Sequence, residues 1–203
     1  VKGEQVLSHY LEPLEQEYTW WMSDADFLDG PGAVLQVVRM PDGEYLNRYW
    51  DVHDTPRPEA YRQDVELAAN SAQQDQLIYR HLRAGAASGW DFSSRWFMDP
   101  DSFESINTTD IIPVDLNCLL YLQEQLIAFA ADRTAQKEKA ALFRQKAEKR
   151  AAAIQQYCWD DKREFYFDYN FVARSRSACR TLAAVFPLFA RIATPEQAMH
   201  VAR

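Results

Sequence analysis

A repeating stripe of apolar residues most constrains the fold of this chain, because its spacing suits a helix and not a strand. Between Asp115 and Asp132, apolar residues recur at offsets that place them on one side of an α-helix. The stripe consists of Leu116, Leu119, Leu120, Leu126, Ile127 and Ala130. Pro113 lies just before it, at a position where a helix tolerates proline well. We therefore predict a long amphipathic helix over residues 115–132.

The next stretch, residues 136–157, repeats this pattern with a strongly charged outer side. Its apolar side carries Ala140, Phe143, Ala147, Ala151 and Ile154. Glu138 and Glu148 are interleaved with lysines and arginines on the other side, which indicates a solvated helix face and not a nucleic-acid patch. Further helices are expected over residues 4–22, 59–69, 73–86, 177–192 and 195–203. The last begins at Thr194-Pro195-Glu196-Gln197, which reads as an N-cap, a proline at the first helical position and a capping-box glutamine.

One segment departs from helical spacing. Residues 34–38 and 44–50 flank the turn sequence Pro41-Asp42-Gly43 and read as a β-hairpin. Helices joined by loops, with one inserted hairpin, predict an all-α architecture. Periodicity alone leaves a bundle, a solenoid and a toroid open as arrangements of these helices.

Composition and charge restrict the possible partners. Hydrophobic residues make up 47% of the chain and charged residues 26%, which is enough for a packed core. The formal net charge of −8 would repel a polyanion, so no nucleic-acid partner is expected. No apolar run approaches the roughly 20 residues that span a bilayer, and the first residues lack the zones of a signal peptide. No membrane partner is therefore expected.

No metal site is predicted either. Cys118, Cys158 and Cys179 are widely spaced and form no CxxC pair or Cys/His cluster of metal-ligand spacing. Free thiols in a reducing compartment are their ordinary interpretation. The histidines are scattered and receive no function.

The loop at residues 88–97 is the richest in groups that can perform chemistry. It places Asp91 between Trp90 and Phe92 and close to Gly89. Aromatic walls exclude water and favour the protonated form of a carboxyl group, as a sugar-cleaving acid requires. Glycine lets the backbone approach a ligand closely. The alternative is that Asp91 caps a helix under aromatic packing.

Two further clusters contain acids and arginines. Residues 46–59 hold Arg57 between two prolines, which stiffens the backbone and suits a ligand contact. A surface ion-pair network with Asp51, Asp54 and Glu59 is the equally weighted alternative. In residues 108–117, Asp115 or Asn117 is expected to cap the following helix. Ser93 and Ser94 do not indicate a serine hydrolase, because no G-x-S-x-G elbow surrounds them.

Taken together, these clusters resemble the trehalases, family 37 of the glycoside hydrolases. The resemblance rests on Asn47-Arg48-Tyr49-Trp50-Asp51, on Asp54-Thr55-Pro56-Arg57-Pro58-Glu59 and above all on Ala87-Ser88-Gly89-Trp90-Asp91-Phe92-Ser93-Ser94-Arg95-Trp96. Residues 113–117 and 143–147 also look like bacterial members, and the similarity extends along nearly the whole chain. A match of this length, rich in Trp, Asp and Arg, is specific.

The resemblance implies an (α/α)6 toroid that hydrolyses α,α-trehalose to two glucose molecules with inversion. In the family the aspartate of Ser-Gly-Trp-Asp is the general acid, a role that falls here to Asp91. Gly89 would contact the sugar, and Arg57, Pro58 and Glu59 would line the substrate site. No metal or organic cofactor is implied, because inverting hydrolysis needs only carboxyl groups and water.

The chain also departs from the family pattern. The upstream Pro-Gly-Gly-Arg-Phe and downstream Gln-Trp-Asp-x-Pro-x-Gly-Trp signatures are missing, and the family's general base, a glutamate from its C-terminal region, has no counterpart here. Residues 1–203 are therefore expected to be the central portion of a single toroid domain, without its upstream and downstream parts. Such a segment would carry the general acid but not the base, and would be inactive or nearly so alone.

Three other interpretations remain. The chain is a catalytically silent sugar-binding helical module, a toroid glycosidase with another α-linked substrate, or a purely structural helical protein. A purely structural role would not explain why the loop has the sequence Trp-Asp-Phe-Ser-Ser-Arg-Trp. The free cysteines favour the cytoplasm over the periplasm as the compartment.

Overall fold

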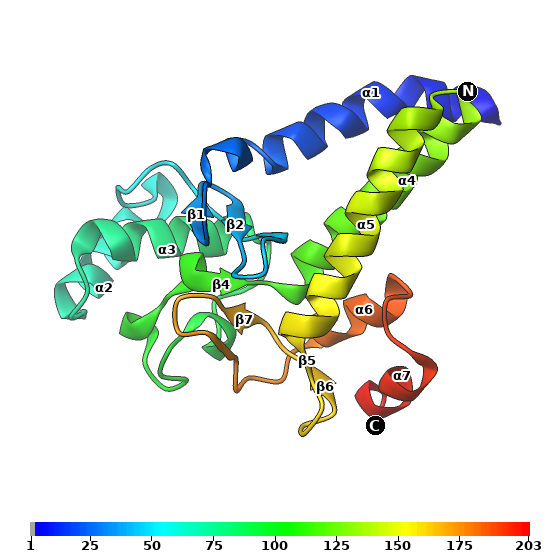
Figure 1. The fold of residues 1–203 in the computed structure, drawn as a ribbon. Helices are drawn as coiled ribbons and strands as arrows, with labels where there is room; N and C mark the ends of the chain where they lie inside the picture. Colours follow the sequence, from blue (N-terminus) through cyan, green and yellow to red (C-terminus); the bar gives the residue numbers. More distant parts are fainter. Residues whose placement is uncertain (1–2) are drawn as a thin grey trace.

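The computed structural model describes residues 3–203, and helices joined by long loops form most of it (Figure 1). The helices are α1 (Glu4–Trp21), α2 (Tyr61–Asn70), α3 (Asp75–Ala87), α4 (Val114–Arg133), α5 (Lys137–Cys158), α6 (Phe186–Phe189) and α7 (Pro195–Val201). The strands are β1 (Gly32–Val34), β2 (Val37–Arg39), β3 (Tyr45–Asn47), β4 (Ile111–Ile112), β5 (Trp159–Asp160), β6 (Phe165–Tyr166), β7 (Tyr169–Asn170) and β8 (Ser175–Arg176). The predicted all-α architecture is thus confirmed.

The two helices that the apolar spacing predicted are α4 and α5, which pack against each other as a long antiparallel pair, and α1 lies along α4 (Figure 1). Leu116, Leu120 and Ile127 are buried between these helices and their neighbours. The predicted stripe was too wide, however, because Leu119 and Leu126 are 46% and 43% exposed. The covered side of α4 is therefore narrower than its apolar side.

The predicted hairpin is present and belongs to a three-stranded antiparallel sheet in the order β1-β2-β3. Val38 of β2 pairs with Leu46 of β3, and both side chains are buried in the core. The turn closes through hydrogen bonds between Met40 and residues 43 and 44, and Gly43 has the positive φ of 89° that favours glycine there. The strand β1 was not predicted.

Two smaller sheets tie distant parts of the chain together. Strand β4, just before α4, pairs with β7, which in turn pairs with β8. Strands β5 and β6 form a separate hairpin after α5. The β4–β7 pairing brings the loop after α3 next to residues 169–176, and this contact builds the site described below.

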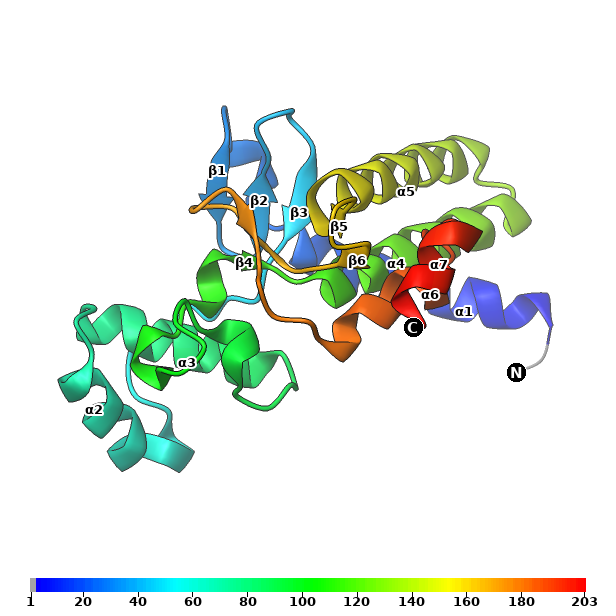
Figure 2. The same ribbon diagram turned by 90° about the horizontal axis from the view of Figure 1, so that it is seen from below.

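The C-terminal elements only partly follow the prediction. Helix α7 begins with the expected capping box, in which Gln197 N donates to Thr194 Oγ1 at 3.1 Å and Thr194 N donates to Gln197 Oε1 at 2.9 Å. The predicted helix over residues 177–192 is wrong. Its first part is extended because Ser177 N donates to Asp168 O, and only a 3-10 turn (Leu182–Val185) and the short α6 follow. In Figure 2 α6 lies against α4.

A buried polar network joins the first half of the chain to α4 and α5. Glu124 Oε1 accepts hydrogen bonds from Tyr18 at 2.9 Å and from Arg150 Nε at 2.9 Å. Arg150 also donates to the side-chain oxygens of Asn47 and Asn117. The sequence had suggested Asn117 as a cap of α4, but its side chain has another role. It holds β3 against the helix through two hydrogen bonds with the Asn47 backbone.

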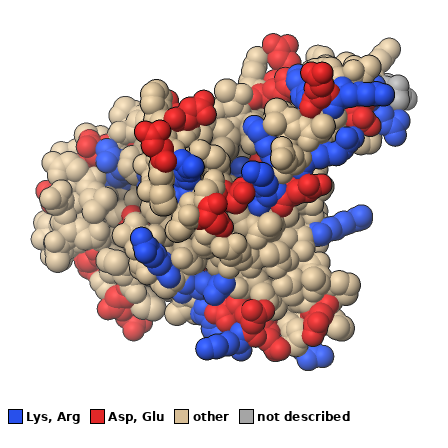
Figure 3. All heavy atoms as spheres, in the orientation of Figure 1, with Lys and Arg blue, Asp and Glu red and all other residues tan. Residues whose placement is uncertain are grey.

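No helix within residues 3–203 is long and apolar enough to cross a membrane. On the face shown in Figure 3, Lys and Arg side chains alternate with Asp and Glu and form no broad basic surface.

Candidate active site

The side chain of Asp91 is exposed on the loop between α3 and α4. It does not cap a helix, because the next helical turn is the 3-10 segment Ser94–Trp96, whose N-cap is Ser93. Among residues 3–203 no side chain or backbone group is hydrogen-bonded to its carboxylate. Gly89, two residues earlier, has a φ of 73°, and a Cβ there would meet no atom within 4 Å. The Asp91 carboxylate and the Gly89 backbone are therefore open to a ligand.

Beneath this loop lies a buried ionic cluster centred on Arg95. Its guanidinium donates to Asp168 from Nε at 2.7 Å and from Nη2 at 3.0 Å. Nη2 also donates to Asp115 at 2.6 Å, so that one cation is shared by two carboxylates. All three side chains are 2% exposed. Burial alone would lower the pKa of Arg95, but the two carboxylates raise it, so the group stays charged.

This cluster fixes the loop on both sides of Asp91. Trp90 Nε1 donates to Asp115 at 2.6 Å, and the Arg95 guanidinium lies 4.8 Å from the Trp90 ring centroid and 4.4 Å from that of Trp96. Asp168 also accepts from Val114 N at 2.9 Å, at the start of α4. Asp115 thus pairs with Arg95 and does not cap α4, which corrects the expectation from the sequence.

Arg57 reaches the same region from the segment before α2. Its guanidinium makes a two-pronged ion pair with Asp64 of α2, at 2.7 and 3.0 Å, and its backbone N donates to the same carboxylate. The side-chain hydrogen bonds to Asp64 raise the pKa of Arg57. The guanidinium also lies 4.9 Å from the ring centroid of Phe92, the residue after Asp91. The structure therefore connects Arg57 to the loop that carries Asp91.

Pro58 and Glu59 follow Arg57 in a 3-10 turn (Pro58–Ala60), and both residues are exposed. The surface ion-pair network expected for this segment is confirmed only in part, because Asp51 and Asp54 form ion pairs but neither pairs with Arg57. Arg57 pairs with Asp64, whereas Asp51 and Asp54 pair with Arg83 and Arg80 of α3, at 3.1 and 3.3 Å. Glu59 makes no ion pair with a residue in the described part of the chain.

A close approach between α3 and the loop sets the position of the Phe92 ring. A Cβ at Gly85 would lie 2.7 Å from Phe92 Cε1. Any larger residue at Gly85 would displace the ring, and with it the neighbour of Asp91 and the partner of Arg57.

Sequence reasoning missed two carboxylates of this region, Asp64 and Asp168. Asp64 lies seven residues after Arg57, and the first turn of α2 carries it back to the guanidinium. Asp168 lies 73 residues from Arg95, and no local pattern marks it. A buried histidine, His81, was also given no role. Its Nδ1 faces Thr109 Oγ1 at 2.9 Å, and burial lowers the pKa of His81 to about 3.

Within residues 3–203 no group of three or more His, Cys, Asp or Glu side chains is arranged to hold a metal ion. The three cysteines are free thiols. Burial raises the pKa of Cys118 and Cys158, which keeps both protonated.

Solved structures similar to this chain show its fold. The neutral trehalase Nth1 from Saccharomyces cerevisiae superposes with a TM-score of 0.66 at 22% identity, covering 98% of this chain and 38% of the yeast chain. A GH63 mannosylglycerate hydrolase from Thermus thermophilus, in complex with glucose, gives 0.54 at 16% identity, covering 98% and 44%. An uncharacterised conserved protein of the same organism gives 0.53 at 16%, covering 98% and 46%.

The chain spans less than half the length of each of these proteins. Its helices form part of an (α/α)6 toroid, as the resemblance implied, and the β2–β3 hairpin predicted from the residue pattern is inserted among them. The family model described as Trehalase matches residues 1–203, the whole of the chain. With the motif around Asp91 intact, the chain belongs to the trehalase family.

Proposed function

We propose that this chain is the acid-bearing central portion of a glycoside hydrolase that cleaves α,α-trehalose to two glucose molecules with inversion. Asp91 is the general acid, and Gly89, Arg57, Pro58 and Glu59 line the substrate site. One observation carries this assignment. The Asp91 carboxylate is exposed and unpartnered among the described residues, on a loop that a buried ion cluster holds on both sides.

This arrangement suits proton transfer to a leaving glycosidic oxygen. A general acid must be held within hydrogen-bond reach of that oxygen, and a loop with fixed ends limits its movement. Phe92 beside Asp91 is half-buried, and Trp90 packs partly against the core, so a bound sugar would find apolar ring surface beside the acid. The open Gly89 backbone allows the sugar to approach from the same side.

Arg57 and Glu59 supply polar contacts next to the acid. The ion pair with Asp64 holds the Arg57 guanidinium in place, while Glu59 is exposed and free to accept hydrogen bonds from sugar hydroxyls. Glu59 binds hydroxyl groups in this proposal and is not the general base. Inversion requires a second carboxylate, about 6.5–9.5 Å from the acid, that activates water on the opposite face of the sugar.

The base and the upstream substrate contacts come from segments of the toroid outside residues 1–203. The extent of the structural match supports this proposal, because this chain superposes on only 38% of the yeast trehalase chain. Residues 1–203 alone should therefore release glucose from trehalose slowly or not at all, and the full-length protein is the form to assay.

Asp91→Asn in the full-length protein tests the acid. We expect the rate of glucose release from trehalose to fall by about 100-fold or more, the range that general acid catalysis contributes. Proton NMR of the first products should show equal amounts of the α and β anomers in the unmodified protein, since inversion affects one of the two glucose units.

Asp101→Asn is the matched control, because Asp101 is an exposed carboxylate on the same loop. It should keep full activity. If the unmodified protein binds trehalose without cleaving it, the chain is a silent sugar-binding module and the enzymatic proposal fails. If it cleaves another α-linked disaccharide faster, the assignment of trehalose as the substrate fails, but the assignment of Asp91 as the general acid stands.

We also propose that the protein works in the cytoplasm, which its free thiols favour. Cell fractionation with activity measured in each fraction tests this, and activity released with the periplasmic fraction would contradict it.

A further inference from the structure

The Arg57 guanidinium keeps one nitrogen free, although the group is tightly held. Its Nε and Nη2 donate to the two carboxylate oxygens of Asp64 at 3.0 and 2.7 Å, and the Arg57 backbone N donates to the same carboxylate at 2.8 Å. The remaining nitrogen, Nη1, has no hydrogen-bond partner among residues 3–203, and protein atoms do not enclose it. Nη1 is therefore open to a ligand.

The direction of Nη1 follows from the planar shape of the guanidinium group. Its three nitrogens point evenly away from the central carbon, so Nη1 points away from the carboxylate that the other two share. The Cζ atom of Arg57 also lies over the ring of Phe92, 4.9 Å from its centroid, and Phe92 is the residue after Asp91. Asp64 and Phe92 together hold the group beside the loop that carries the proposed acid.

The Asp64 carboxylate contacts Arg57 and no other donor in the described part of the chain. Its side chain is 1% exposed, and its three hydrogen bonds all come from Arg57. Asp64 lies in the first turn of α2, but no side chain caps that helix. A two-pronged pair of this kind fixes the orientation of an arginine as well as attracting it.

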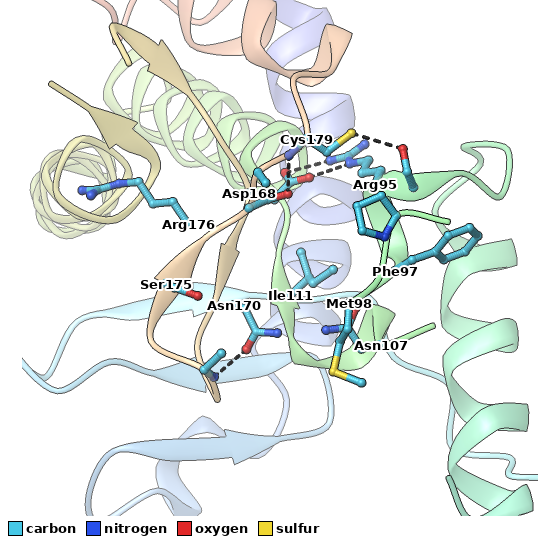
Figure 4. A pocket seen from close by; sticks show the side chains of 15 residues that line it. Arg95, Phe97, Met98, Asn107, Ile111, Asp168, Asn170, Ser175, Arg176 and Cys179 are labelled. Atoms are coloured by element: carbon cyan, nitrogen blue, oxygen red, sulfur yellow. Dashed lines mark hydrogen bonds and ion pairs between the residues drawn. The ribbon is translucent and has the colours of Figure 1, made fainter. Parts of the chain in front are cut away.

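Arg95 has the opposite arrangement, at the wall of the cavity shown in Figure 4. Its Nε and Nη2 donate to Asp168, as the dashed lines show, and its Nη1 and Nη2 donate to Asp115. Every nitrogen of Arg95 thus has a partner, and its side chain is 2% exposed, whereas that of Arg57 is 15% exposed. Two carboxylates occupy Arg95 completely, but Asp64 leaves Arg57 with a donor to offer.

The charges around Arg57 favour a neutral acceptor. The ion pair with Asp64 has no net charge, and the exposed Glu59 adds a negative charge two residues after Arg57. An anion would therefore gain little attraction at Nη1 and would be repelled by Glu59. A sugar hydroxyl oxygen accepts from Nη1 without this cost.

We propose that Asp64 is a positioning residue of the substrate site, which orients Arg57 so that Nη1 donates to a hydroxyl oxygen of the bound sugar. This inference rests on the proposed function, because Arg57 is one of the residues assigned there to the substrate. Lysine could not replace Arg57, because a single ammonium group cannot hold both oxygens of Asp64 and also present a fixed donor to the sugar.

Steady-state kinetics of the full-length protein with trehalose test this proposal. Asp64→Asn keeps the size of the side chain but offers one acceptor oxygen in place of two, so Arg57 loses its fixed orientation. We expect the KM for trehalose to rise about tenfold, as for the loss of a charged hydrogen bond, while kcat stays within about twofold. A purely structural role would instead reduce the amount of folded enzyme, which lowers kcat and leaves KM unchanged.

Three other variants complete the test. Glu66→Gln is the matched control, because Glu66 is an exposed carboxylate on the same helix and pairs with Arg62; it should change neither constant. Arg57→Lys should raise KM as Asp64→Asn does, and the two together should raise it no further, because both remove the same donor. Asp64→Glu keeps the charge but displaces the guanidinium by one methylene, so it should also raise KM, and it replaces Asp64→Asn if that variant does not fold.

Trehalose binding without catalysis separates this inference from the proposed activity. Calorimetry on Asp91→Asn, which lacks the proposed acid, should show about tenfold weaker binding of trehalose when Asp64→Asn is added. If trehalose binds in this way but the unmodified protein never cleaves it, the proposed activity fails and this inference stands. Cleavage with an unchanged KM in Asp64→Asn, or additive effects of Arg57→Lys and Asp64→Asn, would overturn this inference and leave the activity. Absence of both binding and cleavage would overturn both.

Discussion

Removing the guanidinium of Arg95 should destabilise the protein more than any surface change. Arg95→Met keeps much of the side-chain volume but leaves Asp115 and Asp168 buried without their shared cation. Breaking one buried ion pair by deleting a partner costs about 3–5 kcal/mol, and here two carboxylates lose the same partner. We therefore expect the free energy of unfolding to fall by about 4 kcal/mol or more.

Urea denaturation followed by circular dichroism measures this loss, provided that the slope of the transition is unchanged. Arg62→Met is the matched control. Arg62 pairs with Glu66 on the surface of α2, where its side chain is 87% exposed, so the change should cost about 0.5 kcal/mol or less.

A second variant separates charge from packing. The triple change Arg95→Met, Asp115→Asn, Asp168→Asn removes both unpaired charges and should recover part of the lost stability, because neutral amides are less costly to bury than carboxylates. Equal stability of Arg95→Met and Arg62→Met would refute the reasoning. So would a triple variant that is less stable than Arg95→Met alone.

Two further changes test other contacts. Burial lowers the pKa of His81 to about 3, so the unfolded chain takes up a proton at higher pH than the folded one, and stability is lost as pH falls below about 6.5. Between pH 7 and pH 5, the free energy of unfolding should therefore fall by about 2 kcal/mol less in His81→Gln than in the unmodified protein. Urea titrations at the two pH values measure this, and an equal fall in both proteins would contradict the prediction. Gly85→Ala should lower the melting temperature, because its Cβ would lie 2.7 Å from Phe92 Cε1. Gly30→Ala, with no atom within 4 Å, is the control, and a stabilised Gly85→Ala would show that helix propensity prevails.

The parts of the fold that sequence predicted are those that local rules determine. Helices α4 and α5 follow from apolar spacing, because each turn returns a side chain to the same face. The capping box at Thr194 and Gln197 and the Pro-Asp-Gly turn of the β2–β3 hairpin depend on neighbouring residues only. These predictions are confirmed for that reason.

The failures concern residues whose partners are far away in the chain. Asp115 has the position and chemistry of a helix cap, yet its carboxylate pairs with the buried Arg95 of the preceding loop. Residues 177–192 contain enough Ala, Leu and Phe for a helix, but pairing with the Asp168 backbone keeps their start extended. The resemblance named Asp91 and Arg57, while Asp168, which holds the loop in place, leaves no mark in the local sequence.

The separation of the buried polar partners along the chain has a consequence for how the protein reaches its native state. Arg95 meets Asp168 across 73 residues, Arg150 meets Asn47 across 103, and Tyr18 meets Glu124 across 106. Closing such long loops is entropically costly and slows folding. The helices can form early from local contacts, but the loop that carries Asp91 becomes ordered only when residues on both sides of α4 and α5 have come together. During synthesis, that loop therefore stays open to proteases and to other chains until at least Asp168 has left the ribosome.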